Sequence, residues 1–381
     1  MNDIHVMLYD DLTPAQLHLV NTQIPTLAQW RRMPRARSSS VAFAWQHTQL
    51  CAAVAVSHDR YGIDDAQIDV AVIREIFQAP TTTHAVVVDT LMQQALSLLA
   101  EGIGIIMVHG DVSDWAPYGF APISLNGIVT QQNAPKMAVP VLAQYAMPTA
   151  ETWSLIQHMS HLQSRRSPAL YDTASPPQRP WLMLTGRDGQ LRAAVDIVVD
   201  AVSSRVCAAV ASDDGAAFDL LQQLWYTSIV PYKPSLQLPL SHPVVHAALA
   251  QYGVATFNAA SERCVLAGVI DLPLMLNALV PAFERRLRAS AYATWHGGVR
   301  VEISDERAML MIDDGRVTVI DGTREAAVRI KQVDVAALAQ LAFGYRSVAV
   351  LRRTGLLYCD DTELPLCDVL FPACNPVIVL E

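Results

Sequence analysis

The sequence predicts an α/β and α+β protein in which two similar mixed-sheet units precede an α+β unit. In the first unit a strand, a helix and another strand follow one another, which is the order that produces a parallel pair of strands. The second unit repeats this order of strands and helices. In the third unit a run of strands precedes a helix, which is typical of an α+β layer. We expect the three units at residues 1–140, 141–272 and 273–381.

Strands of the first unit are expected at residues 4–9, 41–46, 50–57, 66–77 and 103–108, because these runs are rich in β-forming residues and bounded by turns. A helix is expected to begin at Pro14, since proline suits the first helical position and Thr13 is a good N-cap. Residues 84–100 place apolar side chains on one face of a second helix, and Gly102 suits its C-terminal end.

The second unit is expected to contain strands at residues 181–185, 191–199, 206–211 and 236–238, with helices at 149–162, 218–226 and 242–251. Its first two strands are joined by Arg187-Asp188-Gly189, a sequence typical of a hairpin turn. No residue-level repeat of the first unit is visible. The similarity of the two units therefore rests on the order of their elements.

The third unit is expected to contain strands at residues 298–303, 308–312, 316–320 and 326–330, with helices at 272–289 and 335–343. Asp271 and Asp334 are the expected N-caps of the two helices, and Gly344 is expected to end the second. Asp313-Asp314-Gly315 predicts a tight turn between two of the strands.

The composition is that of a well-packed globular protein. Apolar residues make up 52% of the chain, which is enough for a sizeable core. The net charge of −9 and the lack of a dense Lys/Arg block argue against a nucleic-acid partner. The six cysteines form no CxxC pair, so we expect reduced thiols in a cytoplasmic protein. No stretch of about 20 residues is apolar enough to span a bilayer, so no membrane insertion is expected.

Several short motifs resemble those of a known family. The first unit contains Ile76–Pro80 at the end of a strand and Trp115–Phe120 after the next strand; the third contains Asp313–Val317, Val335–Gly344 and Leu370–Pro372. In this order they resemble the Eis-like (enhanced intracellular survival) branch of the GNAT N-acetyltransferases, which has a sterol-carrier-like C-terminal domain. The resemblance implies two GNAT-like units, transfer of an acetyl group from acetyl-CoA to an amine of a small molecule or peptide, and a homo-oligomer such as a hexamer.

The resemblance also implies an acetyl-CoA loop directly after Pro80. The family motif R/Q-x-x-G-x-G/A then falls on Thr83, Val86 and Val88, and none of the three matches it. Valine restricts the backbone and fills the space that glycine leaves for phosphate oxygens, so weakened cofactor binding and weak or lost activity are expected. The implied cofactor-binding residues are Phe77, Ala79, Thr82, Thr83, His84, Ala85, Val86 and Val88.

The implied catalytic residues are Tyr118, Trp115 and Glu381. The tyrosine that serves as the acid in the family falls on Trp115, whose indole N–H is a very poor acid. Tyr118 either takes over this role or packs as an aromatic residue in a turn. The family's C-terminal carboxylate, which acts as the base, falls on Glu381; the alternative is a frayed chain end. His242 and His246 have a spacing that zinc can use but lack a third ligand, so no metal is expected.

Two further interpretations stay open. In the first, the chain is a catalytically silent relative that binds a small apolar or cationic molecule or a lipid, because three positions of one active site depart from the family motif. In the second, it is mainly a structural protein whose third unit serves assembly into a closed oligomer. Binding of acetyl-CoA separates the enzyme from the silent relative, and the oligomeric state tests the assembly role.

Overall fold

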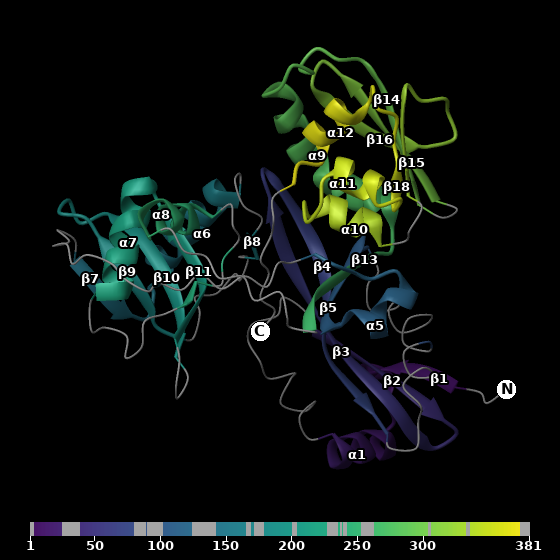
Figure 1. Ribbon diagram of the computed structural model, residues 1–381. Coiled ribbons are helices and arrows are strands. Elements are labelled where there is room, and N and C mark those ends of the chain that lie inside the picture. Colours follow the sequence, from purple (N-terminus) through teal and green to yellow (C-terminus); the bar gives the residue numbers. More distant parts are fainter. Residues whose placement is uncertain are drawn as a thin grey trace.

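The computed structural model describes residues 4–24, 39–79, 89, 102–123, 142–164, 169–170, 179–199, 204–226, 235–236, 238, 242–252, 263–303, 306–332 and 336–373. Their strands form three separate sheets, with helices packed against them (Figure 1). Parallel and antiparallel pairs occur together, so the predicted mixed α/β and α+β class is confirmed. None of the helices in these ranges is long and apolar enough to cross a bilayer.

The first sheet has the strand order β1-β2-β3-β4-β5-β13-β6, and β8 pairs with β3. The strands are β1 (Ile4–Leu8), β2 (Ser39–Gln46), β3 (Gln49–Ile63), β4 (Ala66–Gln78), β5 (Ile105–Asp111), β6 (Ala121–Pro122), β8 (Ala169–Leu170) and β13 (Arg263–Val269). As predicted from the strand–helix–strand order, β4 and β5 pair in parallel. Strand β3 is longer than expected, because the polar residues 58–60 continue the strand into a second apolar segment.

Strand β13 was not expected from the sequence. It lies in the segment that the predicted boundaries assign to the second unit, yet it pairs with β5 and β6 of the first sheet. Directly after β13, Asp271 accepts a hydrogen bond from the amide of Leu274 (2.8 Å) and caps α9 (Leu272–Arg288), as predicted. The backbone of α9 also lies close to Gly104, where an added Cβ would be 2.6 Å from the nitrogen of Met275. Close contact therefore explains a glycine at this position.

Helix α1 (Pro14–Gln23) begins as predicted, after 3-10 helix η1 (Tyr9–Asp11). Thr13 and Gln16 cap the helix reciprocally: the Thr13 amide donates to Oε1 of Gln16 (2.9 Å), and the Gln16 amide donates to Oγ1 of Thr13 (3.4 Å). Val20 packs with Phe43 and other residues of β2 and β3. The helix thus covers one face of the first sheet near its edge.

The second sheet has the order β12-β11-β10-β9-β7. Its elements are β7 (Leu142–Ala146), α6 (Ala150–Ser164), β9 (Trp181–Thr185), β10 (Leu191–Val199), β11 (Ser204–Ala211), α7 (Asp214–Tyr226), β12 (Ser235–Leu236) and α8 (Pro243–Tyr252). Helices α7 and α8 pack on one face, and α6 packs on the other through Trp153 and Ile156. The predicted hairpin turn is confirmed, with Gly189 at a φ of 77°.

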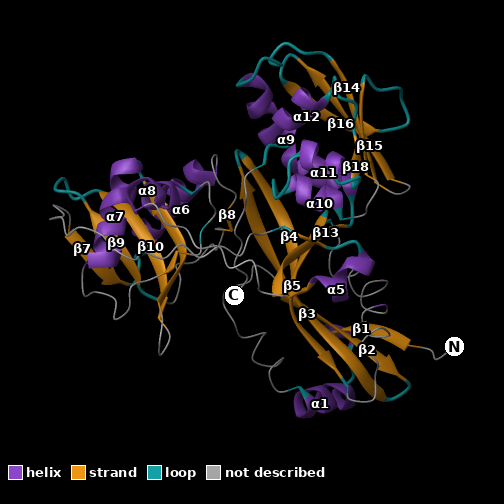
Figure 2. Ribbon diagram, in the orientation of Figure 1, coloured by secondary structure: helices purple, strands orange, loops and turns teal. Residues whose placement is uncertain are grey.

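The third sheet has the order β16-β15-β14-β17-β18, and helices lie against it (Figure 2). Its elements after α9 are β14 (Gly297–Ile303), β15 (Glu306–Asp313), β16 (Arg316–Asp321), β17 (Val328–Gln332), α10 (Ala337–Ala342), α11 (Val348–Arg353), β18 (Leu357–Tyr358) and α12 (Leu364–Leu370). The predicted turn is confirmed, because Asp314 and Gly315 both have positive φ. Helix α10 is shorter than predicted: its N-cap is Ala336 rather than Asp334, while Gly344 follows it at a φ of 66°.

The third unit and the first sheet share one hydrophobic core. Side chains of β3, β4 and β5 pack together with α9, the third sheet and the C-terminal helices. The rings of Tyr61 and Phe343 meet edge to face with centroids 5.1 Å apart. Arg286 of α9 forms an ion pair with Asp64 in the β3–β4 turn, and Nε2 of Gln340 donates to the carbonyl of Pro122 (3.2 Å). The third unit therefore packs against the end of β3 and β4 that contains the β3–β4 turn.

Candidate functional site

The candidate site lies where the neighbouring parallel strands β4 and β5 separate. Their pairing runs from Val70 opposite Ile105 to Ile73 opposite Val108 and goes no further. Beyond this point β4 stays paired with β3, whereas β5 stays paired with β13. The facing backbone groups of the two strands are then no longer paired with each other. Such groups can bind the amides of an extended ligand at the carboxyl ends of the strands.

A β-bulge in β4 accounts for this divergence. Ala55 of β3 is opposite Glu75, whereas the next residue, Val56, is opposite Ile73, so Arg74 is the extra residue on β4. A bulge bends its strand and increases the local twist, and here it occurs at the first residue after the last β4–β5 pair. The bend therefore directs the end of β4 away from β5.

Arg74 holds the bulge in place through two polar residues of β3. Its Nε donates to Oγ of Ser57 (2.8 Å), and its Nη2 donates to Oδ2 of Asp59 (2.6 Å). The Ser57 hydroxyl also donates to Asp59 (3.0 Å). Ser57 is buried and the two charged side chains are mostly buried, so the charges are compensated within the network.

The end of β4 carries the first two predicted cofactor-binding residues. Phe77 packs against the cluster that includes Val20 of α1 and Phe43 of β2. The amide of Ala79 donates to the carbonyl of Cys51 (2.8 Å) and prolongs the β3–β4 ladder by one bond. The other predicted cofactor-binding residues, Thr82, Thr83, His84, Ala85, Val86 and Val88, lie outside the described residues. The predicted phosphate loop thus stays a prediction.

Tyr118 lies in the short segment between β5 and β6. It ends 3-10 helix η3 (Ala116–Tyr118), and Gly119 follows at a φ of 82°. The Tyr118 hydroxyl donates to Oδ1 of Asp89 (2.8 Å), the one described residue of the predicted helix at 84–100. Burial and this hydrogen bond raise the pKa of Tyr118. Tyr118 therefore both packs, as one interpretation expected, and keeps a proton that it can donate.

Trp115 is a core residue. It ends α5 (Val112–Trp115), is only 6% exposed, and its ring centroid is 5.1 Å from that of Phe120. An added Cβ on Gly110 would lie 2.8 Å from the indole nitrogen, so the indole N–H lies against strand β5. The structure thus gives Trp115 a packing role and brings it into the same cluster as Tyr118. Glu381, the predicted base, lies outside the described residues.

His109 was not singled out from the sequence, although it is the first residue of β5 beyond the last pair with β4. Side chains alternate along a strand, so His109 is on the same face as Met107, which packs in the core shared with the third unit. Its side chain is exposed and makes no hydrogen bond or ion pair with the other described residues. No local signal identifies it, because residues 105–108 are all apolar and the position of His109 depends on where the β4–β5 pairing ends.

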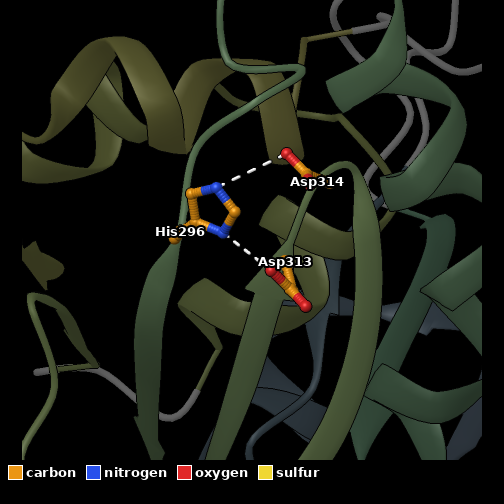
Figure 3. Close-up of side chains that lie close together, drawn as sticks. All are labelled: His296, Asp313 and Asp314. Carbon is orange, nitrogen blue, oxygen red and sulfur yellow. Dashed lines mark hydrogen bonds and ion pairs between the residues drawn. The ribbon is translucent and has the colours of Figure 1, made fainter.

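One group of possible metal ligands occurs among the described residues, and it lies in the third unit (Figure 3). His296 contacts Asp313 through Nδ1 (2.7 Å) and Asp314 through Nε2 (3.4 Å). All three side chains are exposed, and the two carboxylates occupy both ring nitrogens. The geometry is that of an exposed cluster of polar side chains in contact with one another, and we assign no metal to it.

The zinc pattern seen in the sequence has another explanation at His242. This ring is 4% exposed, its Nδ1 accepts from the amide of Val244 (3.1 Å), and its Nε2 lies 3.0 Å from the carbonyl of Ala209. The first contact requires an unprotonated Nδ1, so Nε2 carries the proton and donates. Both nitrogens therefore serve the start of α8 and its packing on β11 rather than a metal.

No family model matches the sequence, and no curated protein is similar to it in sequence. Solved structures do match over nearly the whole chain. A GCN5-related N-acetyltransferase from Kribbella flavida has a TM-score of 0.70 and 15% identity, with 98% of this chain and 97% of that chain covered. One from Anabaena variabilis has a TM-score of 0.70 and 11% identity, with 98% of each chain covered. Eis1 from Mycobacterium abscessus has a TM-score of 0.61 and 14% identity, with 97% of each covered.

The chain therefore has the fold of GCN5-related N-acetyltransferases. At these sequence identities the likeness establishes the fold and leaves the activity to be argued from the site. The Eis-like branch, the sterol-carrier-like character of the third unit and the three unit boundaries stay predictions.

Proposed function

We propose that this protein is an N-acyltransferase that transfers the acetyl group of acetyl-CoA to an amine of a small molecule or peptide. The observation that carries the proposal is the separation of β4 and β5 after Ile73 and Val108, within the fold of GCN5-related N-acetyltransferases. Acetyl-CoA would supply the activated thioester. Its amide-containing arm fits between two strands whose facing backbone groups are not paired with each other.

The fit of the phosphate end of the cofactor is poorer. Amides at the start of the helix predicted after Pro80 would favour an anion. The valines proposed for the two glycine positions, Val86 and Val88, would oppose close approach of the phosphates. We therefore propose weak acetyl-CoA binding, with the strands contributing more of the affinity than the loop.

Tyr118 is the proposed acid for the departing thiolate. Its hydroxyl is protonated and already donates to Asp89 at 2.8 Å, so release of that hydrogen bond makes the proton available. Glu381 and His109 are the two proposed acceptors for the proton of the amine: Glu381 by resemblance, and His109 by its position beside the separated strands.

A catalytically silent relative is the second candidate. It is favoured by the burial of Trp115 at the position of the family's acid, together with the two valines in the loop. Such a protein would bind a small molecule or a lipid on the same scaffold without turnover. It would have the same fold and hydrophobic core as an active acyltransferase but would not catalyse acyl transfer.

Calorimetry with acetyl-CoA and with coenzyme A at millimolar concentration tests the proposal, together with release of free coenzyme A in the presence of simple primary amines and short peptides. Binding with turnover is expected. Binding without turnover would favour the silent relative, and no binding would rule out the acyltransferase. The Val86→Gly/Val88→Gly variant is expected to bind coenzyme A about tenfold more tightly, because close phosphate contact becomes possible.

Replacing Tyr118 by phenylalanine is expected to lower kcat by roughly 10²- to 10³-fold, because general acid catalysis contributes on this order. Affinity for acetyl-CoA should stay within about twofold, since the ring and its packing are retained. Tyr358→Phe is a matched control: its hydroxyl also donates to an aspartate, Asp360 (2.7 Å), but in the third unit. Equal kcat values for the two variants would contradict the role of Tyr118.

A further inference from the structure

Two cysteines of the third unit lie in direct contact inside its core. Cys359 follows β18 and Cys367 lies in α12; neither side chain is exposed to solvent. Their sulfur atoms are 3.4 Å apart, although the residues are eight positions apart in the chain. A disulfide requires an approach of about 1.4 Å, the difference between 3.4 Å and the roughly 2.0 Å of an S–S bond. The folded chain therefore already brings the two thiols together.

The two thiols differ in acidity. Contact with the Cys367 thiol lowers the pKa of Cys359, and the guanidinium of Arg352 acts in the same direction, against burial and the carboxylates of Glu363 and Asp360. The hydrogen bond to Cys359, together with burial, raises the pKa of Cys367. In thiol–disulfide exchange the thiolate is the attacking species, so Cys359 is the nucleophile of the pair and Cys367 is the resolving thiol.

Residues 358–363 cover Cys359, and the contacts that hold this short segment in place lie at the protein surface. Tyr358 and Asp360, its two neighbours, are exposed, and the Tyr358 hydroxyl donates to Asp360. Asp361 forms an ion pair with Arg352, and the amide of Glu363 donates to the carbonyl of Asp360 (3.1 Å). Local opening of such a surface segment costs less than global unfolding, so a small reagent can reach Cys359 without loss of the fold.

We propose that Cys359 and Cys367 form an oxidisable dithiol site that reacts with small disulfides of the glutathione type to give an intramolecular disulfide. The Cys359 thiolate attacks one sulfur of the reagent, the S–S bond of the reagent breaks, and one thiolate leaves and takes up a proton. The Cys367 sulfur, after passing its proton to solvent, attacks the Cys359 sulfur and releases the second thiolate, which is also protonated. The protein loses two protons and two electrons, and the reagent takes them up and becomes two thiols.

The new bond would join the end of β18 to α12. Helix α12 packs on α9, and its Leu370 carbonyl accepts a hydrogen bond from Arg286, which pairs with Asp64 of the first sheet. A crosslink restricts the unfolded chain more than the folded one. The oxidised protein is therefore expected to melt roughly 3–6 °C higher than the reduced protein.

The full chain treated with oxidised glutathione tests the proposal. Arg353 is the last basic residue, so a tryptic peptide would contain Cys359, Cys367 and Cys374 together; the test therefore uses the Cys374→Ser chain. Its intact mass should fall by two hydrogens without a retained glutathione. Cleavage after Glu363 should leave two fragments that separate only after reduction, since Glu363 lies between the two cysteines.

Variants of the same chain define the order of the steps. With Cys367→Ser the reaction should stop at one glutathione on Cys359, whereas Cys359→Ser should prevent both products at this site. Cys51→Ser, which removes a buried thiol of β3, should leave the disulfide unchanged. A Cys374→Ser chain that keeps its hydrogens, retains glutathione as its end product, or falls into free fragments without reduction would overturn the proposal.

Discussion

The Phe343→Ala variant is expected to lose about 3–5 kcal/mol of unfolding free energy, which is the usual effect of deleting a buried phenylalanine. Phe343 is 1% exposed, follows α10, and packs its ring edge to face on Tyr61 of β3. Its removal leaves a cavity at the place where the third unit meets the first sheet, and both sides are held by rigid strands and helices. The surroundings can therefore collapse only partly into the space.

Urea denaturation followed by far-UV circular dichroism measures this loss. Tyr358→Ala is the control, because Tyr358 is an aromatic residue of the same unit that is 49% exposed and should cost less than about 1 kcal/mol. A double-mutant cycle with Tyr61→Leu and Phe343→Leu should give about 1 kcal/mol for the ring pair. A loss below that of the Tyr358 variant would show that the shared core contributes little to stability.

The Arg286→Leu variant is expected to lose about 3 kcal/mol at neutral pH, because it leaves Asp64 buried without its main cation. Arg286 and Asp64 are 12% and 14% exposed, and Arg286 also donates to the carbonyl of Leu370. Arg285→Leu is the matched control. The Arg285 side chain is 35% exposed, and its guanidinium lies 3.7 Å from the carboxylates of Asp64 and Asp65, which is a longer and weaker contact. It should cost less than about 1 kcal/mol.

The loss caused by Arg286→Leu should depend on pH. Burial raises the pKa of Asp64, and Arg286 opposes that shift, so the pKa rises further in the variant. A carboxyl whose folded pKa is raised above its unfolded value destabilises the fold increasingly as pH rises from the unfolded to the folded pKa, and fully above the folded pKa. The difference between variant and wild type should thus be full at neutral pH and shrink as pH falls through the raised pKa. A loss that is constant from about pH 7 to about pH 4 would contradict this account.

The sequence predicted local features of the fold well. The caps at Thr13 and Asp271, the turn at Asp313–Gly315 and the glycine after α10 were confirmed, because each depends on residues within four positions of one another. The helices at 348–353 and 364–370 were not predicted. Both are short, and their burial in the shared core, rather than a helical pattern of their own, stabilises them.

The candidate site could be predicted only in part. Tyr118 was named from a motif, but its partner Asp89 is 29 positions away, and no local pattern joins them. Arg74 and His109 were missed, because a bulge and the end of a strand pair exist only once two strands lie side by side. The alternation of residues along a strand gives the face on which each side chain lies. It does not give the register between strands, which places a residue where β4 and β5 separate.

The sequence by itself determined where most strands, turns and helix caps of this protein lie, because neighbouring residues set those through backbone geometry and short-range hydrogen bonds. Only the tertiary structure decided the place of β13. Residues 263–269 add to the first sheet between β5 and β6, after the chain has passed through the second sheet. Strand β13 pairs there because β5 offers an apolar surface and backbone groups that need a partner. Such long-range pairing leaves no signal in the local sequence.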